Sequence, residues 1–133
     1  MIRKHIMDAI LKDVHQEIDE TATSIISQLK SPDIFYPPNI EITNEEKIAL
    51  SSLDLSEAAH SGLKKLVSNA CAKPLFQLFC MLDGVGDPTG IDEIWTGVLM
   101  TERATDDKGD EDFDMLHDEF FETSWLYKDW TKE

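Results

Sequence analysis

Two apolar runs separated by an acidic, glycine-containing turn constrain the fold of this sequence more than any other feature. The runs are residues 75–82 and 94–100, and the turn between them contains three glycines and one proline. The second run is rich in Trp, Thr, Val and Ile, which favour strands, and a strand needs a hydrogen-bonding partner. The first run fits a helix as well as a buried strand, but it is the nearest candidate partner. We therefore predict a β-hairpin over about 75–101.

The N-terminal segment, by contrast, has the apolar spacing of a long helix. Apolar residues recur every three or four positions over about seven turns: Ile2, Ile6, Ile10, Val14, Ile18, Ala22, Ile25 and Leu29. Pro32 sets the end of this segment, because the residue before a proline avoids the helical region. A second long helix is predicted near the C-terminus, from Asp110 or Asp112 to about Trp130, with acidic residues in its first turn.

Shorter elements are predicted between these helices. The proline-containing segment 31–44 is expected to be an extended connector, with a short edge strand over 39–42. Thr43 and Glu46 have the spacing of a capping box, which predicts a helix to about Leu53. A further helix, capped by Asp54 or Ser56, is predicted to end at 73–74, where Lys precedes Pro.

Together these elements predict an α+β fold in which helices pack on a small antiparallel sheet centred on the β-hairpin, within a single domain over 1–133. The two cysteines, Cys71 and Cys80, lie in apolar surroundings and form no CxxC pair. A disulfide framework is therefore not indicated, and a reducing cytoplasm is the expected location. The sequence has no apolar stretch of about 20 residues that would span a membrane.

Charge is concentrated in the C-terminal part of the chain. The formal net charge is −15, and residues 81–133 alone carry 16 acidic against 4 basic side chains, a net charge of −12. Such a field repels phosphate groups, so nucleic acid and anionic membranes are poor candidate partners. It attracts a basic protein or a cation instead. The simpler alternative is that the acidity only keeps the protein in solution.

No recognised catalytic or cofactor motif is complete. The Gly84-Val85-Gly86 stretch lacks the third glycine of a dinucleotide loop, and no phosphate-binding GxxxxGK sequence is present. No nucleophile elbow is found, and Cys80 lies in an apolar run where a thiol is expected to be inert. The sequence therefore predicts no catalytic residue and no cofactor, and it favours a protein that is not an enzyme.

A metal site is the remaining chemical alternative. The loop over 83–93 could hold a hard cation through carboxylate oxygens, although its spacing is not that of an EF-hand. His117, flanked by acids on the C-terminal helix, is the other candidate ligand. A metal-dependent enzyme or cation-binding module built on these residues stays open as the second hypothesis, but no metal ligand is assigned.

The first hypothesis is an acidic interaction protein that binds a basic protein, as immunity proteins and other inhibitors bind nuclease toxins. The contact residues are expected on the turn and on the start of the last helix. They are Asp83, Asp87, Asp92, Glu93, Asp106, Asp107, Asp110, Glu111, Asp114 and Asp118. The sequence does not identify the partner or the oligomeric state.

Overall fold

The protein divides into two compact units in the computed structural model, which describes residues 2–103 and 116–122. The first unit comprises Met1–Ser27 and Asp54–Arg103, and the second comprises Gln28–Leu53 and Ala104–Glu133. In each unit, two segments that are distant in sequence come together. The expectation of a single domain stays a prediction.

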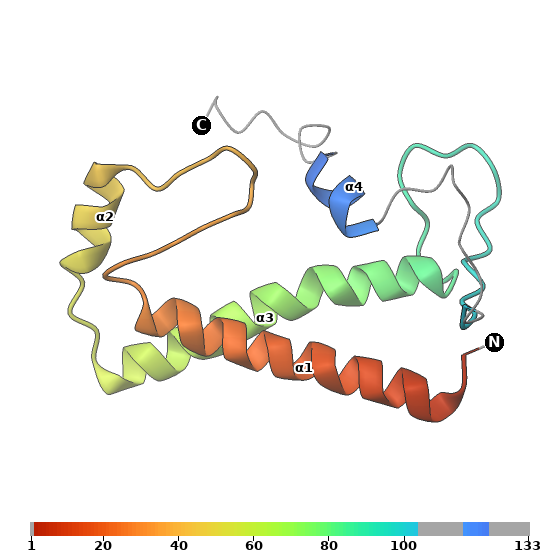
Figure 1. The fold of residues 1–133 in the computed structure, drawn as a ribbon, viewed down its shortest axis with the longest axis horizontal. Helices are drawn as coiled ribbons and strands as arrows, with labels where there is room; N and C mark the ends of the chain where they lie inside the picture. Colours follow the sequence, from red (N-terminus) through yellow and green to blue (C-terminus); the bar gives the residue numbers. More distant parts are fainter. Residues whose placement is uncertain (1, 104–115, 123–133) are drawn as a thin grey trace. The chain divides into compact units, whose positions relative to one another are not determined.

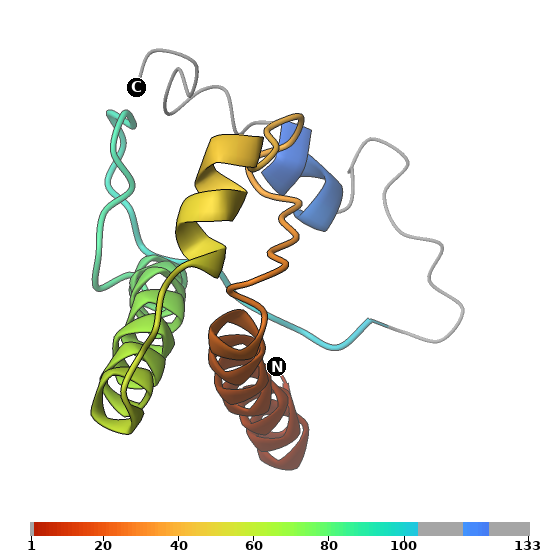
Figure 2. The same cartoon turned by 90° about the vertical axis from the view of Figure 1, so that its left-hand side faces the viewer.

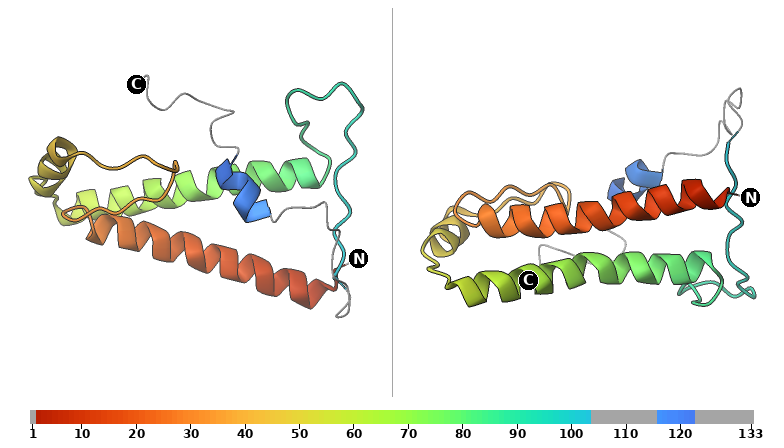
Figure 3. Two further views of the ribbon diagram at one scale, coloured as in Figure 1. Left: turned by 45° about the horizontal axis from the view of Figure 1, so that its top comes forward. Right: turned by 90° about the horizontal axis from the view of Figure 1, so that it is seen from below.

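Two long helices form the first unit. Helix α1 spans Lys4–Ser27 and helix α3 spans Glu57–Leu82. They lie side by side and run in opposite directions (Figures 1 and 3). The predicted N-terminal helix over 2–30 is thus confirmed. Its apolar spacing places one face of α1 against α3, where Ala22 is buried.

Helix α3 continues through the first of the two apolar runs, so the prediction of a strand over 75–82 is wrong. The predicted end of the helix at Pro74 is also wrong, because Pro74 lies inside α3. A row of half-buried side chains explains the continuity, since its spacing of four residues runs unbroken across the proline. The row consists of Leu63, Val67, Cys71, Leu75 and Phe79. Packing of this row outweighs the local preference of Pro74 to end a helix.

The second apolar run is not a strand either, and the predicted hairpin over 75–101 is absent. The segment crosses the C-terminal end of α3, where the Trp95 indole Nε1 donates to the Met81 carbonyl at 2.6 Å. The Val98 amide donates to the Leu82 carbonyl at 2.8 Å. These donors satisfy carbonyl groups that a helix end leaves without intrahelical partners. Gly97, with φ at 92°, interrupts the extended backbone that a strand would need.

The backbone of the second apolar run passes very close to the backbone at the end of α3. A Cβ atom on Gly97 would lie 2.6 Å from the Leu82 carbonyl oxygen, and one on Gly84 would lie 2.6 Å from the Thr96 oxygen. Both glycines have positive φ values. Only residues without a Cβ fit where the two backbones pass each other.

The second unit contains helix α2, which spans Asn44–Ser51, and helix α4, which spans Leu116–Glu122. The predicted capping box at the start of α2 is confirmed: the Glu46 amide donates to the Thr43 hydroxyl, and the Thr43 amide donates to the Glu46 carboxylate. At the start of α3 the Ala59 amide donates to the Ser56 hydroxyl at 3.1 Å, so Ser56 is the cap of the two that were predicted. The segment before α2, including the predicted edge strand over 39–42, is not a strand.

The connector before α2 lies beside α4 (Figure 2), and aromatic side chains join these two segments within the second unit. The rings of Tyr36 and Phe120 stack with centroids 5.2 Å apart, and Phe35 meets Phe121 edge to face at 5.9 Å. These ring contacts link the connector to α4. The rest of the predicted C-terminal helix, over 110–115 and 123–130, lies outside the described residues.

The described ranges therefore contain helices and no strand, and the predicted α+β class is wrong. They also contain little buried apolar surface: Ala22 is the one buried residue among them. No helix in this part of the chain is both long and apolar enough to cross a membrane.

Candidate functional site

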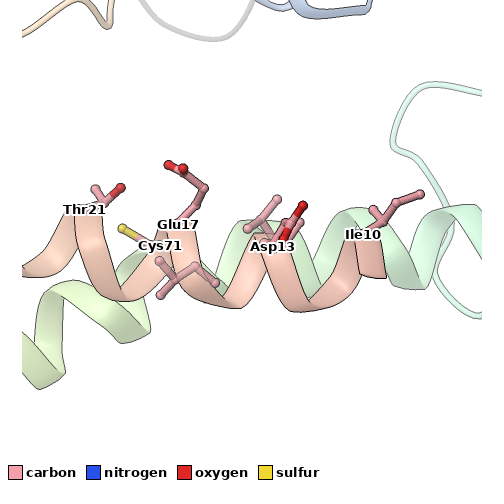
Figure 4. Close-up of a pocket in the computed structure, with 8 residues that line it drawn as sticks. Ile10, Asp13, Glu17, Thr21 and Cys71 are labelled. Atoms are coloured by element: carbon pink, nitrogen blue, oxygen red, sulfur yellow. The ribbon is translucent and has the colours of Figure 1, made fainter. Parts of the chain in front are cut away.

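An open apolar groove runs between α1 and α3 in the first unit (Figure 4). Its volume is about 440 Å³. Ile10, Val14 and Ile18 of α1 form one wall, and Cys71 and Leu75 of α3 form the other. Each wall is a row of side chains spaced four residues apart, which is the spacing that brings side chains together on one face of a helix.

Carboxylates border the α1 side of the groove. Asp13, Glu17 and Thr21 complete its lining, and they lie along the same side of α1 as Ile10 in Figure 4. Asp13 and Glu17 are exposed and form no ion pair with any described residue. The groove thus combines an apolar floor with two free negative charges at its edge.

The predicted turn acids lie after α3 rather than between two strands. Asp83, Asp87, Asp92 and Glu93 are all exposed. None of the four takes part in an ion pair within residues 2–103 and 116–122. We call these four residues the acidic loop. Asp83 is the C-cap of α3, and its backbone amide donates to the Phe79 carbonyl at 2.8 Å.

The remaining predicted contact residues belong to the second unit. Asp118 lies exposed on α4, 3.4 Å from Nε2 of its neighbour His117. The other five lie outside the described residues: Asp106, Asp107, Asp110, Glu111 and Asp114. The structure therefore locates the acidic loop and Asp118 but does not show one acidic surface.

Across the described ranges, no three His, Cys, Asp or Glu side chains converge as metal ligands would. His117 contacts the Asp118 carboxylate, and no further ligand-type side chain joins this pair in that part of the chain. No observation of the structure favours the metal alternative over the interaction hypothesis.

The Glu102 carboxylate of the first unit forms an ion pair with Arg3. The Arg3 guanidinium donates to both oxygens of Glu102, at 2.6 Å from Nη2 and 2.9 Å from Nε. The Arg3 backbone amide adds a bond to the same carboxylate at 3.2 Å. These hydrogen bonds, with the positive charge of Arg3, lower the pKa of Glu102 to about 2. The negative charge of Glu102 is therefore already paired with Arg3, unlike the charges of the acidic loop.

The sequence does not predict the groove, because the residues of its two walls lie more than 50 positions apart in the chain. One signal was present. Asp13 and Glu17 each follow an apolar residue of the α1 stripe by three positions, so acids border the stripe on one side. Nothing in the sequence indicates that Cys71 and Leu75 face this stripe, because the sequence predicts a strand at Leu75.

Comparison with known proteins identifies no relative: no family model, curated protein or solved structure matches this chain.

Proposed function

We propose that this chain is a protein-interaction protein that binds a basic protein partner through its acidic residues. The observation that carries the proposal is the acidic loop, whose four carboxylates are exposed and form no ion pair with the described residues. A carboxylate without an internal partner remains available to Lys or Arg of another protein. The net charge of −12 over residues 81–133 adds to the attraction of the whole chain for a basic protein.

The acidic residues accelerate encounter and select the partner, rather than supplying most of the affinity. Exposed charge pairs contribute about 0–1 kcal/mol each, whereas a complementary field raises the association rate and rejects acidic competitors. Asp118 and the acidic residues Asp106, Asp107, Asp110, Glu111 and Asp114 are proposed as further contacts of the same partner. The contribution of each residue is expected to be small and cumulative.

A nuclease toxin is the partner class that fits this chemistry best. The substrate-binding surface of a nuclease is lined with Lys and Arg, because it must neutralise phosphates. A protein that offers carboxylates in place of phosphates binds there and blocks the substrate. We therefore propose an immunity-type or inhibitor role, in which the partner is inactive while bound.

The test is affinity capture from a lysate of the source organism, followed by identification of the retained protein. The bait is the full chain, and the variant bait carries Asp83→Asn, Asp87→Asn, Asp92→Asn and Glu93→Gln. A matched control removes four other exposed carboxylates, with Asp8→Asn, Glu20→Gln, Glu41→Gln and Asp54→Asn. Both variants change the net charge equally.

We expect a basic protein to be retained by the full chain and the control at about 0.05 M salt, and to be released at about 0.5 M salt. The acidic-loop variant should retain less of it. Retention that is the same for all three baits, or that does not respond to salt, would contradict the proposal. If the captured protein is a nuclease, its inhibition by the full chain tests the inhibitor role directly.

A further inference from the structure

We propose that the groove between α1 and α3 receives an amphipathic helix of a basic protein partner. Apolar side chains of that helix fill the groove, and its Lys or Arg residues face Asp13 and Glu17. The choice of a basic partner rests on the proposed function above. The groove itself rests on a separate observation, the apolar lining between the two helices.

The apolar side chains of the groove remain partly exposed to water, which favours binding of another apolar surface there. Ile10 in the groove is 47% exposed, and the other apolar wall residues are only half-buried. Two antiparallel helices can each cover one side of the other, but an apolar stripe wider than about 100° leaves part of itself in water. A third helix laid along the seam removes this exposed surface from water.

The shape of the groove suits a helix better than a compact small molecule. Its lining on α1 extends from Ile10 to Thr21, which is about 17 Å of helix at 1.5 Å per residue. A partner helix of about three turns matches this length. It would present apolar residues at i, i+4 and i+7 to the walls, which is the usual spacing of anchors in helix-in-groove recognition.

The two carboxylates at the groove edge favour a partner helix that carries basic residues. Asp13 and Glu17 are four residues apart on α1, so their carboxylates lie about one helical turn apart at the groove edge. Basic residues at the same spacing on the occupant pair with both. An acidic or neutral helix would leave the two carboxylates beside apolar surface without a counter-charge.

The same argument disfavours a second copy of this chain as the occupant. Each copy carries a net charge of −15, so association of two copies brings like fields together. In the part of α1 outside the groove, Lys4 is already paired with Asp8. A helix from a basic protein is attracted by the same charges that repel a second copy.

Cys71 provides a reporter, because its thiol lies in the groove wall. The test uses the full chain with Cys80→Ser, which leaves Cys71 as the single thiol. The probe is a synthetic helical peptide of about 18 residues, since much shorter helices are marginal in water. It carries Leu at i, i+4 and i+7, with Lys on both flanks. The control peptide has the same composition in a scrambled order without an apolar stripe.

The rate of Cys71 modification by a maleimide is measured with and without each peptide, and peptide affinity is measured by fluorescence anisotropy. We expect the striped peptide to slow modification about tenfold at saturation and the scrambled peptide to leave the rate unchanged. Ile10→Gln should weaken binding about tenfold by removing apolar contact. Its matched control is Ile25→Gln, which changes an α1 isoleucine of similar exposure, 44%, outside the groove.

The groove carboxylates are tested in the same assay. Asp13→Asn with Glu17→Gln should weaken binding about fivefold and reduce its salt dependence. Asp8→Asn with Glu20→Gln removes two exposed carboxylates of α1 that do not line the groove, and should change affinity by less than about twofold.

Four results would overturn the proposal. If the maleimide does not modify Cys71 in the monomer without peptide, the chain covers its own groove. Protection that rises with protein concentration, together with a dimer in sedimentation, means that a second copy is the occupant. Equal binding of the striped and scrambled peptides, or equal effects of Ile10→Gln and Ile25→Gln, means that the groove is not the binding site.

These outcomes are separate from those of the proposed function. If the acidic-loop variant loses the captured protein while Ile10→Gln retains it fully, the proposed function stands and the groove proposal fails. If no basic protein is captured but the striped peptide protects Cys71, the groove binds a helix and the proposed function fails.

Discussion

The close crossing at the end of α3 predicts that Gly97→Ala destabilises the protein much more than Gly90→Ala. Both glycines have nearly the same φ, 92° for Gly97 and 89° for Gly90. A Cβ on Gly90 would meet nothing within 4 Å, whereas one on Gly97 would lie 2.6 Å from the Leu82 oxygen and 2.8 Å from the Gly84 nitrogen. The pair therefore separates the effect of close backbone approach from that of positive φ.

The magnitude follows from what each substitution changes. A positive φ costs a residue with a Cβ about 1–2 kcal/mol, and this cost applies to both variants. The loss of unfolded-state entropy on replacing glycine also applies to both and cancels in the difference. In Gly97→Ala the crossing segment must move away from α3, which breaks the bonds from Val98 and Trp95 to the helix end. Each bond contributes about 1 kcal/mol, so Gly97→Ala should cost about 2 kcal/mol more than Gly90→Ala.

The assay is urea-induced unfolding followed by far-ultraviolet circular dichroism and by tryptophan fluorescence. Coincident transitions and equal m-values in the three proteins are required for the comparison of unfolding free energies. If Gly90→Ala and Gly97→Ala lose the same stability within about 0.5 kcal/mol, the crossing does not close on the end of α3, and our account of this segment is wrong.

Three further predictions concern the ends and the middle of the helix pair. Trp95→Phe removes the indole donor to Met81 and should lower the urea unfolding free energy by about 1 kcal/mol; no loss would show that this bond is not formed. Glu102 has a pKa of about 2 instead of the ordinary 4.5, so its pairing with Arg3 stabilises fully above about pH 4.5 and is lost as pH falls through about 2. Acid titrations should therefore show less pH dependence of stability between 4.5 and 2 in Glu102→Gln, and an unchanged profile would contradict the pairing. Pro74→Ala should raise unfolding free energy by about 1–3 kcal/mol, because proline is unfavourable inside a helix; no change, or a decrease, would refute a continuous helix.

Elements whose stability is local could be predicted from the sequence. The spacing of isoleucines predicted α1, and the Thr43–Glu46 spacing predicted the cap of α2. Ser56 was one of two expected caps for α3 and is the residue that caps it. Each signal involves residues within about four positions of each other, so the interaction it predicts forms wherever the rest of the chain lies.

What the two apolar runs become depends on tertiary contacts. Residues 75–82 are compatible with helix and strand, and their contact with α1 makes them the end of α3. Residues 94–100 have strand composition, but they bind the carbonyl groups at that helix end through Trp95 and Val98. Both outcomes depend on partners that local sequence does not specify, because apolar burial does not depend on direction or on chain distance.

The candidate site divides in the same way. The charge of the acidic loop could be predicted from the sequence, since charge depends on composition alone. Its place after a helix, instead of between strands, could not. The groove required two helices to come together, and only then did Cys71 and Leu75 meet the apolar row of α1. Composition thus determined the charge offered to a partner, and packing between distant segments decided which apolar side chains form the groove.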